Sequence, residues 1–120
     1  MKKDPRVYLA QILERIDRIV MFTDKGKDAF FHDLVVQDAV IRNFEVIGEA
    51  AKRIPVEYRE ATPMIPWKGL TSLRDVLIHQ YEGVSVDEVW GIVENELPDI
   101  RKNIASILPS LDQLEHELSE

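Results

Sequence analysis

The apolar residues of this 120-residue chain recur every three or four positions over most of its length. That spacing places them on one face of an α-helix, whereas a half-buried strand alternates with a period of two. No segment shows the strand alternation, and no internal repeat is present. The first apolar stripe comprises Leu9, Ile12, Leu13, Ile16, Ile19 and Val20. The sequence therefore predicts an all-α protein.

Start and stop signals divide the first half of the chain into helices. Asp4 followed by Pro5 is typical of an N-cap and a first helical position, and residues 23–26 form a turn that ends this first helix. Asp28 is predicted to cap a short helical turn through residue 31. A second long helix is expected from about 34 to 53, with a buried line of Val36, Val40, Phe44 (or Asn43), Ile47, Ala50 and Ile54.

Prolines and a capping box organise the second half. A short helix is expected over 56–60, and Pro66 is predicted to start a third long helix that ends near Gly83. Its buried line is Trp67, Leu70, Leu73 and Leu77. Ser85 and Glu88 form a capping box for the last helical region. Pro98 must kink that region or begin a fresh helix, because its ring cannot donate the interior hydrogen bond.

The expected architecture is an up-and-down bundle of four long helices with short accessory helices. The length allows one domain, 1–120, with residues from about 115 onward frayed. No apolar run approaches a membrane span and the N-terminus does not resemble a signal peptide, so we expect a cytoplasmic protein. The chain has no Cys, which excludes disulfides, thiol nucleophiles and Cys-ligated metals.

Net charge is −7, which argues mildly against a nucleic-acid partner. The whole excess of negative charge lies in residues 81–120, which contain two basic and ten acidic residues. The middle of the chain is close to neutral, so a local basic pocket is compatible with the sequence.

Metal ligands are poorly represented. His32, His79 and His116 are far apart, and no Glu has a His three residues later as di-iron bundles require. Glu45 and Glu49 share a helix face, but beside Arg42 and Arg53 a solvated or ion-paired face is the better interpretation. No phosphate-binding glycine loop or dinucleotide fingerprint occurs, and no cofactor is expected.

Three residues suited to phosphate chemistry lie close together at the end of the third long helix: Arg74, His79 and Tyr81. Arginine binds phosphate bidentately and stays charged, and histidine can act as base and then acid. A tyrosine can stack on a base or accept a covalent group on its hydroxyl. On a straight helix Tyr81 lies about 20° from Arg74, but His79 lies about 140° away. Either the helix loosens near His79, or two copies of the chain meet across a two-fold axis.

A structural interpretation fits the same residues. A histidine at a helix C-terminus often stabilises the dipole, Arg74 could pair with a nearby acid, and Tyr81 could belong to the core. Spacing alone does not decide between these interpretations.

The pattern Arg74-x4-His79-x-Tyr81 resembles the signature of HepT, the toxin of HEPN/MNT toxin–antitoxin modules. The resemblance extends over roughly residues 4–108 and includes the blocks 36–52, 65–67, 73–79 and 89–98 in the family's order. It implies an all-α HEPN fold, a homodimer and a metal-independent endoribonuclease that leaves a 2′,3′-cyclic phosphate. Gln80 departs from the family, in which Asp or Asn is common at this position.

The resemblance also implies roles for individual residues. His79 would be the general base or acid, Arg74 would hold the phosphate, and Tyr81 would receive AMP from a cognate MNT nucleotidyltransferase that silences the toxin. Weaker predictions for supporting residues are Arg42, Asn43, Glu49, Asp75 and Gln80. Two rival functions use the same residues: a non-catalytic subunit that presents a nucleotide or substrate to a nucleotidyltransferase, and a purely structural helical dimer.

Overall fold

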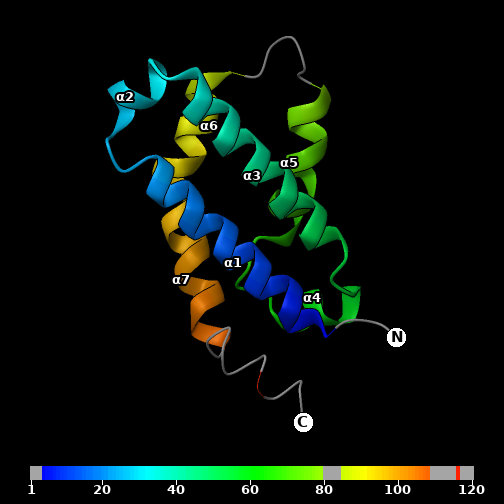
Figure 1. Ribbon diagram of the computed structural model, residues 1–120. Helices are drawn as coiled ribbons and strands as arrows, with labels where there is room; N and C mark the ends of the chain where they lie inside the picture. The colour runs from blue at the N-terminus through cyan, green and yellow to red at the C-terminus, as the bar shows by residue number, and fades with distance from the viewer. Residues whose placement is uncertain (1–3, 80–84, 109–115, 117–120) are drawn as a thin grey trace.

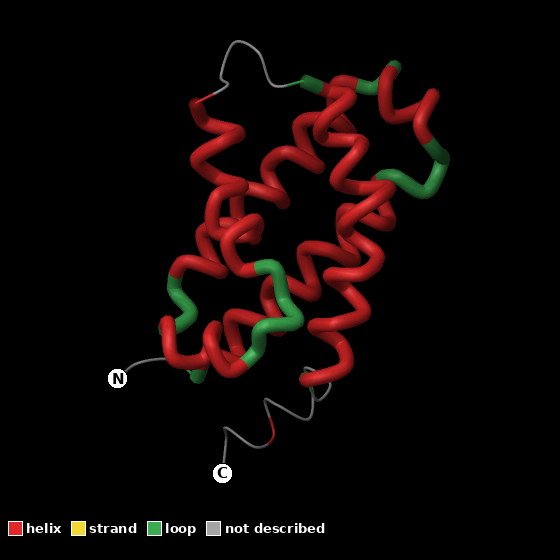
Figure 2. Tube along the Cα trace, turned by 180° about the vertical axis from the view of Figure 1, so that it is seen from behind, coloured by secondary structure: helices red, strands yellow, loops and turns green. Residues whose placement is uncertain are grey.

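The computed structural model describes residues 4–79, 85–108 and 116, with the side chains of 74–79 left undescribed. Over these residues the chain is helical and contains no strand (Figure 2), which confirms the all-α prediction. The elements are α1 (Pro5–Phe22), α2 (Lys27–Phe31), α3 (Leu34–Lys52), α4 (Val56–Ala61), α5 (Trp67–His79), α6 (Val86–Gly91), the π-helical turn η1 (Ile92–Glu96) and α7 (Leu97–Ile107). No helix of the described chain is long and apolar enough to cross a membrane.

Local capping explains where the first helices begin and end. The Asp4 carboxylate accepts a hydrogen bond from the backbone N–H of Arg6 at 2.8 Å, and Pro5 opens α1 as predicted. The Arg6 side chain also bonds this carboxylate and lowers the pKa of Asp4, so the cap stays charged. Asp33 caps α3 by accepting from Val35 and Val36.

The predicted cap of α2 is wrong. Gly26, not Asp28, occupies the N-cap position, and Asp28 lies inside the first turn. The backbone of Gly26 has φ of 95°, a left-handed conformation that glycine adopts without strain. This turn reverses the chain between α1 and α3.

The core forms where α3 packs between α1 and α5, with α7 alongside α1 (Figure 1). The predicted buried line of α3 is confirmed except that Val36 is only partly buried. The fully buried side chains include Leu9, Ile12, Ile16, Ile19, Val40, Phe44, Ile47, Ile54, Leu97 and Ile104. One flank of α3 therefore faces α1 and the other faces α5.

The regular α-helix of the last helical region is interrupted just before Pro98, as predicted. Ser85 caps α6 by accepting from the N–H of Glu88 at 3.3 Å. The helix then widens into η1, where Leu97 donates to the carbonyl of Ile92, and α7 begins at Leu97 with Pro98 in its first turn. Proline has no N–H and its ring clashes with the carbonyl four residues earlier, which accounts for the wider turn.

Candidate active site on helix α5

The N-terminal end of α5 is anchored by Trp67. Its indole N–H donates to the backbone carbonyl and the hydroxyl of Thr62, both at 3.1 Å, and the ring is buried. Leu70 is buried one turn later and Leu73 is partly buried against the core. The helix begins at Trp67, one residue after the predicted start. These contacts fix the direction in which α5 runs toward its C-terminal end.

Arg74 and His79 lie in the last two turns of α5, which remains an α-helix through His79. A regular helix rotates about 140° and rises about 7.5 Å over five residues. The loosening that would let both side chains of one chain converge is therefore not present in the backbone. Asp75 lies beside Arg74 on α5, whereas Gln80 and Tyr81 fall outside the described residues.

The C-terminal end of α5 lies at the same end of the molecule as the start of α3 and the start of α6 (Figure 1). Phe30 of α2 and Trp90 of α6 meet there, with ring centroids 5.3 Å apart. The Arg74–His79 turns thus lie at the end of the bundle and not in its middle.

Asn43, predicted as a supporting residue, is buried on the α1 side of α3. Only 5% of it is exposed, and its Oδ1 accepts from the Arg15 guanidinium of α1 at 3.4 Å. Its Nδ2 donates to the carbonyl of Ala39 at 2.7 Å. A buried amide with both ends hydrogen-bonded is satisfied where it stands, so the structure shows Asn43 joining α1 to α3.

Among the described side chains, no hydrogen bond or ion pair joins Arg42 or Glu49 to α5. Arg42 is exposed and pairs with Glu45 at 3.3 Å. Glu49 lines a polar cavity with Tyr8 of α1 and with Arg53. The prediction that α3 faces the motif helix is confirmed, while a supporting role for these side chains stays a prediction.

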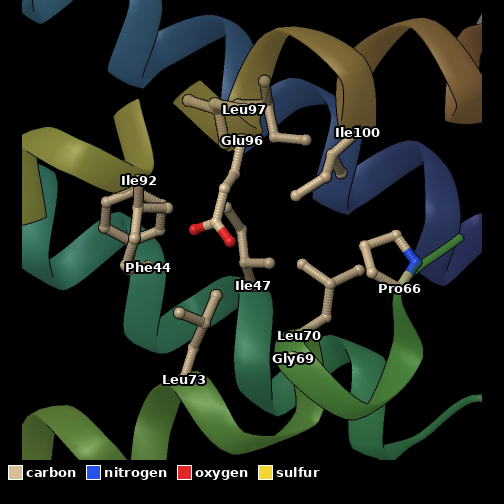
Figure 3. Close-up of a pocket in the computed structure, with 11 residues that line it drawn as sticks. Phe44, Ile47, Pro66, Gly69, Leu70, Leu73, Ile92, Glu96, Leu97 and Ile100 are labelled. Carbon is tan, nitrogen blue, oxygen red and sulfur yellow. The ribbon is translucent and has the colours of Figure 1, made fainter. Parts of the chain in front are cut away.

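A second feature near the motif was not anticipated from the sequence. An apolar cavity lies beside α5, next to η1 and α7 (Figure 3), and Leu73 of α5 forms part of its wall one residue before Arg74. Glu96 of η1 brings a carboxylate to it. The one sequence signal was Pro98, which required an irregular turn somewhere before it.

Metal binding is not evident in the described part of the chain, where no three His, Asp or Glu side chains could hold one ion together. The candidate catalytic groups predicted from the sequence remain the arginine and histidine of α5.

Comparison with known proteins identifies the family. The model of the ribonuclease HepT-like family matches residues 12–107, a range that includes α5 and both Arg74 and His79. This chain belongs to the ribonuclease HepT-like family. The resemblance inferred from the motif and its neighbouring blocks is thereby confirmed, and with it the all-helical HEPN fold.

Similar proteins carry names that are consistent with this family. A protein of Methanocaldococcus jannaschii called "Putative RNase" is 44% identical over 92% of this chain and 93% of its own length. "Probable ribonuclease HepT" of Thermococcus cleftensis is 40% identical over 84% of this chain and 93% of its own.

A longer M. jannaschii protein, named as a gamma-glutamylcyclotransferase and putative RNase, is 44% identical over 94% of this chain. This chain spans 51% of that relative's length. No solved structure matches the chain at comparable significance.

Proposed function

We propose that this chain is the toxin of a type VII-like HEPN/MNT toxin–antitoxin pair and cleaves RNA internally without a metal ion. The observation that carries the proposal is the placement of Arg74 and His79 on the C-terminal turns of α5, in a chain of the ribonuclease HepT-like family. Relatives named as RNases support the same activity.

The chemistry requires one proton acceptor, one proton donor and a positive charge. The RNA 2′-hydroxyl attacks the adjacent phosphorus as His79 takes its proton, and a 2′-O–P bond forms. The P–O5′ bond then breaks, the 5′-oxygen leaves with the proton that His79 returns to it, and a 2′,3′-cyclic phosphate remains. Arg74 stabilises the charge that builds on the phosphate oxygens. No step needs an oxidant, a nucleotide or a metal.

A homodimer is part of the proposal. Because α5 is regular through His79, Arg74 and His79 of one chain diverge by about 140°. Two copies related by a two-fold axis can place Arg74 of one opposite His79 of the other. Each dimer would then carry two equivalent sites, each built from both chains.

The first prediction concerns metal dependence. Purified protein incubated with total RNA should cleave it equally well with and without EDTA, and the fragments should carry 2′,3′-cyclic phosphates detectable by resistance to direct 3′-end ligation. Full inhibition by EDTA with recovery in magnesium or manganese would overturn the 2′-hydroxyl mechanism. Absence of cleavage in every condition would favour the rival function, a non-catalytic nucleotide-binding subunit.

The second prediction concerns silencing through Tyr81. Transfer of AMP from ATP to the Tyr81 hydroxyl by a partner nucleotidyltransferase releases pyrophosphate and leaves a phosphodiester on the tyrosine. Since Tyr81 shares a helical stripe with Arg74 in the sequence, the added negative charge would occupy the guanidinium and repel RNA phosphate. We expect intact protein co-expressed with the nucleotidyltransferase to gain the mass of one adenylate.

The matched variant for this test is Tyr81→Phe, which keeps the ring and removes the acceptor oxygen. It should gain no adenylate at this position and should remain toxic in the presence of the partner. Tyr58→Phe is the control, because Tyr58 lies at α4, far along the chain from the motif, and should be modified and silenced like the wild type. A Tyr81→Phe protein that the partner silences as well as it silences the wild type would refute the switch.

A further inference from the structure

The cavity beside α5 has walls from five helical elements. Ile16 of α1, Ile47 of α3, Leu73 of α5, Ile92 of η1 and Ile100 of α7 all contribute apolar surface. It encloses about 80 Å³ and opens on one side. Since protein interiors are packed to near crystal density, an apolar space of this size is unusual, and it has room for a small apolar group.

Glu96 supplies the charge at this cavity. Figure 3 shows its carboxylate directed among the apolar side chains, between Ile92 and Leu73. Within the described part of the chain, no hydrogen bond or ion pair links this carboxylate to another residue. Its neighbour Glu94, in contrast, accepts a hydrogen bond from the Trp90 indole at 2.9 Å. Glu96 is exposed overall, so its carboxylate stands at the open side of the apolar wall, an arrangement complementary to a cation on a short apolar chain.

The backbone around Glu96 explains why the carboxylate is there. In η1 the hydrogen bond from Leu97 to Ile92 spans five residues, which places Ile92 and Leu97 on the same side of the turn, and both line the cavity. Glu96 directly precedes Leu97 and is carried toward the same space. The turn is fixed by Pro98, so the placement of Glu96 is built into the helix.

We propose that this cavity binds a small alkylammonium ion, with its aliphatic chain between Leu73 and Ile100 and its ammonium on the Glu96 carboxylate. The volume of the cavity limits the ligand to a small molecule. The space is smaller than the cavity of about 150 Å³ that holds benzene in another protein, so it suits a short unbranched chain and not an aromatic ring. The open side lets the charged head reach Glu96 and water together.

The test uses the full-length ¹⁵N-labelled protein titrated with n-butylammonium chloride at constant ionic strength. Saturable shifts are expected for the amides of Gly69, Leu73 and Ile92, with a dissociation constant on the order of 1 mM, as for a ligand of a few heavy atoms. 1-Butanol has the same chain without the charge. It should bind more weakly, by up to about fivefold, which is the value of an exposed ion pair.

Two variants and a control complete the experiment. Glu96→Gln should lose the preference for the ammonium over the alcohol. Asp99→Asn, an equally exposed charge change one turn away that does not line the cavity, should keep it. Gly69→Leu should abolish binding of both, since a Cβ at Gly69 meets nothing within 4 Å and the added chain can enter the space.

Equal affinity for butanol and butylammonium, or an unchanged preference in Glu96→Gln, would refute the ammonium site. Absence of saturable shifts up to about 50 mM would refute binding altogether. The readout is binding and not RNA cleavage, so failure here is separate from failure of the proposed function.

Discussion

His79→Ala and Arg74→Ala should each lower RNA cleavage by about 100-fold or more while the protein stays helical. The first removes the group that moves the proton, and the second removes the charge that stabilises the phosphate in the transition state. Cleavage of total RNA by the purified variants measures the loss, and far-ultraviolet circular dichroism measures the fold. Lys68→Ala, an exposed charge change at the other end of α5, is the matched control and should cleave like the wild type.

Mixing the two inactive variants tests whether the site is shared between copies. If Arg74 of one chain works with His79 of the other, a mixed dimer contains one site with both native residues and one site with neither. Co-refolded or co-expressed variants should then regain on the order of a quarter of wild-type cleavage, since about half the dimers are mixed and each has one of two sites.

Two outcomes would contradict this scheme. No recovery on mixing, in a preparation shown to contain mixed dimers, would mean that each site belongs to one chain. A His79→Ala protein that cleaves RNA like the wild type but unfolds more readily would show that His79 is a structural residue at the end of α5.

Phe44→Ala should cost about 3 kcal/mol of the free energy of unfolding. Phe44 is 1% exposed, and it lies on the buried line of α3 among Ile16, Leu73 and Leu97. Removing a buried phenyl ring loses its transfer free energy and leaves a void, a change that costs about 3–5 kcal/mol in well-packed cores. We expect the lower end of that range, because one side of the ring already borders the cavity.

Urea unfolding followed by circular dichroism measures this loss, which would leave a domain of ordinary stability, about 5–15 kcal/mol, with about 2–12 kcal/mol. Leu34→Ala is the matched control on the same helix. Its side chain is 75% exposed, so its replacement should change stability by less than about 0.5 kcal/mol. A loss below about 1 kcal/mol for Phe44→Ala would mean that the ring does not pack as described.

Much of this protein could be predicted from its sequence because the decisive signals are local. Caps such as Asp4 and Ser85 act through hydrogen bonds within three residues, and the apolar period follows directly from helix geometry. The effect of Pro98 likewise depends only on its own ring and the preceding turn. The Arg74-x4-His79-x-Tyr81 pattern pointed to the family for a similar reason, since a motif is a property of residue order.

The tertiary structure alone decided which flank of α3 meets which neighbour. Asn43 and Glu49 belong to α3, the helix that packs against α5, but both side chains lie on the flank toward α1. Which flank of a helix faces which neighbour depends on how the three helices pack together, and the sequence of one helix does not record that packing. The cavity at Glu96 has the same origin. It exists because α1, α3, α5 and the continuous η1–α7 region, which are far apart in the sequence, leave a space that no local pattern of residues records.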